Sequence, residues 1–144
     1  MQTINFYNQD ITFVLKHKTT IRQWIKKVVE QNTFEIQEIN FIFCPDDYLL
    51  QINVEHLNHN YYTDIITFDN SEKQNSLTSD LFISIDRVKD NAKQFNVIFA
   101  QELNRVMIHG ILHLMGLKDK TKEEKKMMRQ QENNCLEQLK IMLV

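Results

Sequence analysis

The fold is decided by residues 79–119, whose sequence is SDLFISIDRVKDNAKQFNVIFAQELNRVMIHGILHLMGLKD. Residues 80–86 begin and end with an aspartate and are apolar and β-branched in between, which predicts a strand. Apolar residues then recur at helical spacing over 87–95 and again over about 99–115. A strand followed directly by two helices predicts a domain that mixes α and β structure.

The same patterns extend outward to both ends of the chain. Residues 4–7, or alternatively 11–15, are β-branched and aromatic and predict the opening strand. The other expected elements are a helix from a Thr19–Thr20 cap to about residue 31, a strand over 39–43, a helix capped by Asp46 to about residue 57, a strand over 64–68, a polar stretch over 69–79 and a helix over about 122–139. Helices prevail at the C-terminal end, so we expect an α/β or α+β layer built on one small sheet.

Length and composition fit one soluble globular domain. The chain has 144 residues, only two Gly and one Pro, and no repeat or linker, so we treat 1–144 as a single domain. No signal-peptide pattern and no apolar run near the roughly 18 residues of a membrane helix is present, so no membrane partner is expected. Cys44 and Cys135 lack CxxC spacing, which favours buried apolar residues and a cytoplasmic location.

Charge is distributed unevenly, although the formal net charge is only -2. No Lys or Arg occurs between Lys27 and Lys73, whereas basic residues are frequent near the C-terminus. This pattern permits a local basic surface on a mildly acidic protein. The alternative is an ordinary solvated helix face, because Glu123, Glu124 and Glu132 are interleaved with the last basic residues.

A candidate metal site begins with His109 and His113. The two histidines are four residues apart in a helical pattern, so both imidazoles project from one face of the helix, as they do in zinc sites. Gly116 is suited to end the helix in a left-handed conformation and to reverse the chain, which could bring Asp119 to the histidines. Two histidines and one carboxylate leave a coordination position open, as catalytic sites require. The alternative is a pair of core histidines.

The residues around the two histidines limit the chemistry. Gly110 stands where the metalloprotease signature HExxH has its general-base Glu. The hypothesis that the chain is a peptidase therefore depends on the HxxxH spacing alone. A glycine inside a helix lowers helix stability by about 1 kcal/mol relative to alanine. We therefore expect a compensating reason for Gly110, such as close approach of another backbone or access for substrate. Glu102 and Arg105 lie upstream on roughly the same face. We include Arg105 as a candidate catalytic residue that orients a ligand or contacts substrate, with a surface ion pair as the alternative.

The chain resembles the YbeY family of bacterial endoribonucleases, which are described as rRNA maturation factors. The family hallmark is HGxLHLxG with a third ligand six residues after the second histidine, and residues 109–116 match this run without a gap. Further resemblance lies in Asn53, in TDIITF over 63–68, in SDLFIS over 79–84 and in Glu102–Leu103.

This resemblance implies an α+β fold with a small mixed four-stranded sheet packed with helices and a metal site at the C-terminal helix pair. It implies one Zn²⁺ per chain, or another divalent transition metal, bound by His109, His113 and Asp119. The implied activity is cleavage of single-stranded RNA by metal-activated water or by metal-assisted attack of the ribose 2′-hydroxyl. The implied role is maturation of the 16S rRNA 3′ end and ribosome assembly or quality control on the small subunit. DNA is not an expected substrate.

Two positions depart from the family pattern. Asp119 stands where a third histidine is usual, and it is a competent but harder ligand. Leu57 stands where an arginine is usual that is thought to contact RNA. The residues that would have to replace this arginine are His56, His59, Arg105 or Lys118. These departures motivate an alternative function, an RNA-binding ribosome-assembly factor with weakened catalysis and a structural metal site.

Aromatic and basic residues offer further RNA contacts. Tyr61 and Tyr62 precede the predicted 64–68 strand and could stack on an unpaired base, or serve only in packing. Lysines near the histidines would bind the RNA backbone electrostatically, which predicts strong salt dependence.

Overall fold

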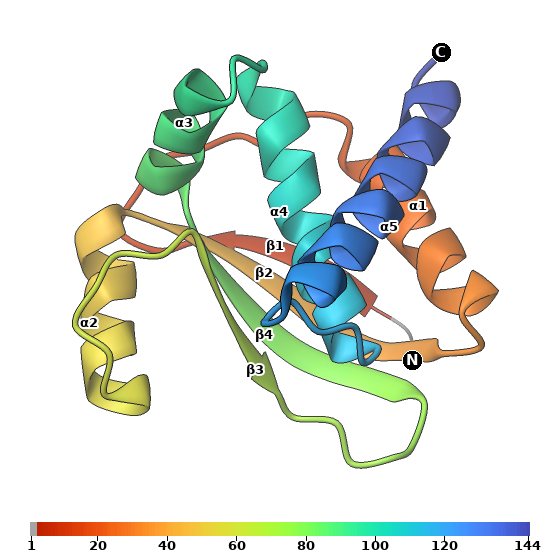
Figure 1. Ribbon diagram of the computed structural model, residues 1–144, viewed down its shortest axis with the longest axis horizontal. Coiled ribbons are helices and arrows are strands. Elements are labelled where there is room, and N and C mark those ends of the chain that lie inside the picture. The colour runs from red at the N-terminus through yellow and green to blue at the C-terminus, as the bar shows by residue number, and fades with distance from the viewer. Residues whose placement is uncertain (1–2) are drawn as a thin grey trace.

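The fold combines four strands and five helices in the described residues, 3–144, of a computed structural model (Figure 1). In chain order the elements are β1 (Thr3–Asn8), α1 (Lys18–Gln31), β2 (Glu35–Cys44), α2 (Asp46–Leu57), β3 (Ile65–Asp69), β4 (Ser76–Ser84), α3 (Ile85–Gln94), α4 (Phe99–Leu114) and α5 (Lys122–Met142).

The strands form a single mixed sheet in the order β1-β2-β4-β3. β1 and β4 both run parallel to the central β2, whereas β3 pairs antiparallel with β4 at one edge. The expectation of a small mixed four-stranded sheet is therefore confirmed. β4 leads directly into α3, and the antiparallel edge strand β3 lies against α4, so the predicted histidine helix crosses the sheet at that edge (Figure 1).

The main hydrophobic core lies between the sheet and the layer formed by α1, α3, α4 and α5 (Figure 1). The apolar stripe of α1 is buried as its spacing predicts, and Trp24 at its centre is fully buried. The Trp24 indole N–H donates to the Cys135 carbonyl of α5 at 2.7 Å. This bond fixes α5 against α1 and so contributes to the position of the α5 residues that face α4.

A second, smaller core lies on the opposite face of the sheet, under α2. It consists of Leu49 and Ile52 of α2, with Cys44 and Ile66 from the strands. Figure 1 shows α2 and α4 on different sides of β3, although the first residue of α2, Asp46, pairs with Arg87 of α3.

Both cysteines are free and buried, as expected. Burial is the main cause that raises the pKa of Cys44 to about 12 and that of Cys135 to about 11. Thiols with such a high pKa remain protonated and unreactive at neutral pH.

The sheet differs from the sequence-based expectation in three places. β2 begins at Glu35, four residues before the start of the predicted strand. Residues 11–15 form no strand, because β1 is the earlier candidate segment. β4 begins at Ser76, inside the stretch predicted to be a polar loop, because this segment pairs with β2 from Glu35 onward, with a register irregularity between Ile36 and Glu38. Tertiary pairing outweighs the low strand propensity of that sequence.

Two helix caps also differ from the prediction. α1 begins after His17, whose φ of 61° is left-handed, and no threonine caps this helix. α2 begins after Pro45, so Asp46 is its first residue and not its cap. The Asp46 carboxylate instead accepts a hydrogen bond from Ser84 at 2.9 Å and pairs with Arg87 at 2.6 Å. α5 by contrast has a capping box formed by Thr121 and Glu124.

Across residues 3–144, no helix combines the length and apolarity needed to cross a membrane.

Candidate metal centre

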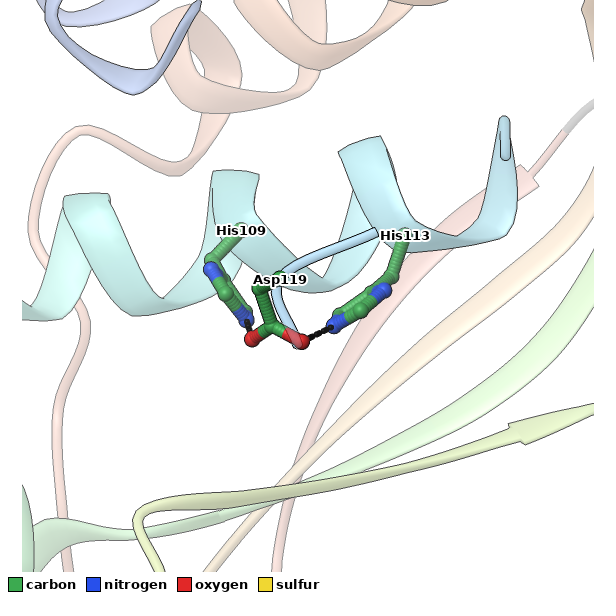
Figure 2. Close-up of side chains that lie close together, drawn as sticks. All are labelled: His109, His113 and Asp119. Atoms are coloured by element: carbon green, nitrogen blue, oxygen red, sulfur yellow. Dashed lines mark ion pairs between the residues drawn. The ribbon is translucent and has the colours of Figure 1, made fainter. Parts of the chain in front are cut away.

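His109, His113 and Asp119 come together at the C-terminal end of α4. Figure 2 shows both imidazoles projecting from one side of the helix toward the Asp119 carboxylate. The Nε2 atom of His109 lies 3.3 Å from Asp119 Oδ2, and the Nε2 atom of His113 lies 3.3 Å from Asp119 Oδ1. Ligand atoms of all three residues lie within 4.8 Å of one another.

This arrangement fits a metal ion. A tetrahedral zinc ion with bonds of about 2.0–2.2 Å keeps its ligand atoms about 3.4 Å apart, close to both nitrogen–oxygen distances here. The donor set of two imidazoles and one carboxylate suits zinc and other divalent transition metals. All three side chains are partly exposed, so a fourth position at this site would be open to solvent or substrate. The group could therefore hold an ion.

The two glycines of the chain build this site locally. At Gly110 a Cβ atom would lie 2.5 Å from Cδ2 of Leu81 and 2.8 Å from Cδ1 of Ile65, so the expected close approach is to the sheet. Gly116 has φ +105° and follows the end of α4, as expected. The chain turns back there, with the Leu117 N–H bonded to the Leu112 carbonyl at 3.1 Å, and carries Asp119 to the histidines.

A residue that the sequence pattern does not single out supports His109 from the other side. Glu132 of α5 is 4 % exposed, and its Oε2 lies 2.7 Å from Nδ1 of His109. Burial by itself favours the neutral imidazole, but the hydrogen bond and the charge of Glu132 outweigh it and raise the pKa of His109. Burial likewise opposes ionisation of Glu132, yet the bonds from His109 and Arg105 lower its pKa. The Glu132 carboxylate therefore fixes which ring nitrogen of His109 faces Asp119.

Arg105 belongs to this supporting network. Its Nη1 donates to Oε1 of Glu132 at 3.0 Å, and its Nε lies 3.9 Å from Oε1 of Glu102. Both carboxylates are buried, so these are not surface ion pairs. Burial raises the pKa of Glu102, against the opposing charge of Arg105. The alternative interpretation, in which Glu132 belongs to a solvated helix face, is wrong for this residue, since its turn of α5 packs against α4.

Two open hollows flank the His109–Asp119 pair. The first, of about 360 Å³, lies among α3, α4 and α5 and includes Phe95, Lys125 and Arg129. The second, of about 530 Å³, lies on the α2 and β3 side and includes Leu57 and Tyr61 among other residues. Four residues, Asp64, Ile65, His109 and Asp119, line both hollows. The metal group therefore sits at the junction of two adjoining spaces.

Asp64 is a second functional candidate that sequence spacing does not single out. Its Oδ2 accepts a hydrogen bond from Nδ2 of Asn91 at 3.1 Å, and it lies beside His109 at the junction. Burial raises the pKa of Asp64, more than the nearby His109 lowers it. A carboxyl with a raised pKa at a site is a candidate for proton transfer.

The residues considered as replacements for the family arginine are dispersed. His59 lines the second hollow, whereas His56 packs edge-on against Phe68 at 6.0 Å. Lys118 lines neither hollow. Leu57 itself lines the second hollow and is 42 % exposed.

The two tyrosines have different surroundings. The Tyr61 ring stacks on His59 at 5.2 Å and lines the second hollow. Tyr62 lines neither hollow, since its hydroxyl donates to Asp47 at 3.3 Å and its ring lies under the Arg87 guanidinium at 5.1 Å.

Comparisons with known sequences all point to the same protein family. The family model for Endoribonuclease YbeY matches residues 3–140. The chain is 50% identical over 135 residues to the Endoribonuclease YbeY of Cytophaga hutchinsonii, covering 94% of each sequence. It is 42% identical over 140 residues to that of Porphyromonas gingivalis strain W83, covering 97% of this chain and 92% of the relative. The solution structure of TM1509 from Thermotoga maritima has the same fold, with a TM-score of 0.67, 23% identity and coverage of 95% and 89%. The chain belongs to the Endoribonuclease YbeY family.

Proposed function

We propose that this chain is a metal-dependent, single-strand-specific endoribonuclease of rRNA maturation, acting at the 16S 3′ end and in ribosome assembly or quality control. The observation that carries the proposal is the convergence of His109, His113 and Asp119 at the junction of two open hollows, in a member of an endoribonuclease family. The proposed location is the cytoplasm, which agrees with two free, buried thiols.

The metal would be held by the two Nε2 atoms and the Asp119 carboxylate. We propose one Zn²⁺ per chain, with another divalent transition metal as the option that the carboxylate ligand leaves open. Such an ion supplies Lewis acidity toward water and toward phosphate oxygens. Glu132 keeps the Nδ1 proton on His109, so that Nε2 is free to bind.

Residues at or beside the junction of the two hollows would carry out the proton transfer and the positioning of the ligands. Asp64 is placed to accept the proton of the attacking hydroxyl, whether that group is a water molecule or the ribose 2′-hydroxyl. Its raised pKa favours holding that proton after transfer. Arg105 acts through Glu132 as a positioning residue, because its guanidinium is already bound to that carboxylate.

The shape of the site supports a particular class of substrate. A phosphodiester at the junction would have one neighbouring nucleotide in each hollow, and bases can enter such spaces only when they are unpaired. The proposed substrate is therefore a single-stranded segment of precursor rRNA, and the proposed partner is the small ribosomal subunit.

The test is cleavage of an RNA hairpin with a long single-stranded extension. Metal-free protein should be inactive, and addition of about one equivalent of Zn²⁺ or Mn²⁺ should produce cuts in the extension only. His113→Ala should abolish both metal retention and cleavage, whereas His17→Ala, which alters an exposed histidine that lines neither hollow, should retain both. Cleavage that persists after chelation and in His113→Ala would contradict the proposal.

One observation favours a second function. Leu57 places an apolar side chain where the family pattern has an arginine, which suits an RNA-binding assembly factor with a structural metal and little nuclease activity. Such a factor would retain its metal and bind RNA, yet leave every single-stranded substrate intact with each metal tested.

A further inference from the structure

The two hollows that adjoin the metal group differ in whether cationic side chains line them. The second hollow is lined by no Lys or Arg, and it includes the carboxylates of Asp64 and Asp69. The first hollow also has carboxylates in its lining, Asp64, Glu102, Asp119 and Glu132, but it adds three cations, Arg105, Lys125 and Arg129. Cationic side chains for an RNA backbone are therefore available on the α5 side of the metal group and missing from the α2 side.

The three cations of the first hollow are not equally available. Arg105 is largely buried and bonded to Glu132 at 3.0 Å, so its charge is already balanced. Arg129 reaches the same carboxylate only at 3.7 Å, and 53% of its side chain is exposed. Lys125 is exposed and makes no ion pair within residues 3–144. One turn of α5 thus presents two solvated positive charges to the hollow.

An aromatic ring lines the same hollow. Phe95 ends α3 and is 55 % exposed, although it is a large apolar side chain. It belongs to neither hydrophobic core. An exposed aromatic ring together with cations that track a phosphate backbone is the combination with which proteins hold single-stranded nucleic acid.

We propose that the first hollow is a nucleotide subsite, in which Lys125 and Arg129 bind the phosphate next to the scissile one and Phe95 stacks on the base. This inference rests on the proposed RNA substrate and assigns the electrostatic part of its binding to α5. The cation that the α2 side lacks at Leu57 is supplied from another helix. The RNA strand then crosses the His109–Asp119 junction from the hollow that contains Lys125 and Arg129 into one without Lys or Arg.

α5 provides a matched control for the two cations. Lys125→Ala/Arg129→Ala and Lys122→Ala/Lys126→Ala each remove two positive charges, four residues apart on the same helix, but Lys122 and Lys126 do not line the hollow. For the aromatic ring, Phe95→Leu is compared with Tyr7→Leu, which alters an exposed ring on β1. Metal content of each variant is measured first, because Arg129 lies near Glu132, and all should retain the metal.

The probe is a fluorescein-labelled oligouridylate of about 12 nucleotides, bound to metal-free protein so that no cleavage occurs, with affinity measured against salt concentration. Each phosphate contact on a single strand contributes about 0.7 to the slope of log K against log salt, so loss of both cations should lower that slope by about 1.4. The Lys122→Ala/Lys126→Ala control should keep the wild-type slope. Phe95→Leu should weaken binding about fivefold without changing the slope, and Tyr7→Leu should leave both unchanged.

The outcomes separate this inference from the proposed function. Equal slopes for the two double variants, or a Phe95→Leu affinity equal to wild type, would overturn the subsite. Slope and affinity changes as expected, in a protein that cuts no RNA with any metal, would support the subsite and overturn the nuclease. Wild-type protein that binds no oligouridylate would overturn both.

Discussion

Oε2 of Glu132 lies 2.7 Å from Nδ1 of His109, although the two residues are on different helices. The other oxygen of the same carboxylate accepts a hydrogen bond from Arg105 at 3.0 Å. Both partners of Glu132 are on α4, so one buried side chain of α5 sets the orientation of a candidate ligand and ties the two helices together. The site is thus shaped before any ion binds.

Glu132→Gln tests this positioning role. An amide can still occupy the space but loses the charge that holds the Nδ1 proton, so we expect the affinity for Zn²⁺ to fall about 10- to 100-fold. Competition with a chromogenic chelator measures the change. Glu137→Gln, an exposed change on the same helix, should have no effect. Equal affinities in the two variants would show that Glu132 does not influence the metal.

The pH dependence of the metal-free protein follows from the same pair. The pKa of His109 is raised above its ordinary 6.5, so its contribution to stability is complete below pH 6.5 and is lost as the pH rises through the raised value. Glu132, with a pKa lowered from 4.5, contributes above pH 4.5 and loses this contribution as the pH falls through the lowered value.

Thermal unfolding of metal-free protein between about pH 5 and pH 9 should therefore show stability falling on the alkaline side of pH 6.5. Metal affinity should rise over the same range, because binding displaces a proton from His109. Glu132→Gln should reduce the loss of stability at alkaline pH. A wild-type stability that rises steadily through this window would contradict the assignment.

Arg105→Met should be strongly destabilising. It leaves the buried carboxylates of Glu132 and Glu102 without their cation, and breaking such a pair costs about 3–5 kcal/mol. Arg129→Met removes another cation near Glu132, but an exposed one at 3.7 Å, so its cost should be at most about 1 kcal/mol. Urea unfolding of the metal-free proteins measures both values. Similar losses of unfolding free energy in the two variants would mean that the ion pair between Arg105 and Glu132 is effectively solvated.

Asp64→Asn tests the proton-transfer role. The amide preserves size and can still face Asn91, but it cannot accept a proton, so kcat for RNA cleavage should fall about 10²- to 10⁴-fold with metal content unchanged. The matched control is Asp69→Asn, an exposed change at the edge of the second hollow, which should retain activity. Full activity in Asp64→Asn would assign the proton transfer to another group.

Much of the candidate site could be predicted from sequence, because its information is local. The four-residue spacing fixes His109 and His113 on one helix face, and Gly116 permits the reversal that carries Asp119 back. Glu132 was not predictable in this way. It lies among alternating charges typical of a solvated helix, and only the packing of α5 on α4 shows that it is buried.

The fold shows the same division. The α1 stripe and the two helices after β4 follow from apolar periodicity, which is a property of each segment alone. The first residues of β4 are mostly polar, and they form a strand because β2 provides hydrogen-bonding partners for them. Likewise, the subsite cations and Phe95 come from separate helices, so no spacing in the sequence connects them.

Gly110→Ala should destabilise the protein although it raises helix propensity. The gain in propensity is about 1 kcal/mol, but a Cβ atom would lie 2.5 Å from Cδ2 of Leu81, which is fully buried and cannot move away freely. Overpacking of this kind costs about 1–3 kcal/mol, so we expect a net loss of up to about 2 kcal/mol in the free energy of unfolding, measured with urea. Gln101→Ala, at an exposed position of the same helix, should be neutral or slightly stabilising.

A second variant tests whether a steric clash causes the expected destabilisation by Gly110→Ala. Leu81→Val shortens the side chain nearest to the added methyl group, so Gly110→Ala should cost less in that background than in wild type. A coupling of about 0.5 kcal/mol or more between the two substitutions would identify the contact between α4 and β4 as the reason for glycine. Simple additivity would instead mean that α4 moves as a whole, and the His109–Asp119 geometry, measured through metal affinity, should then change with it.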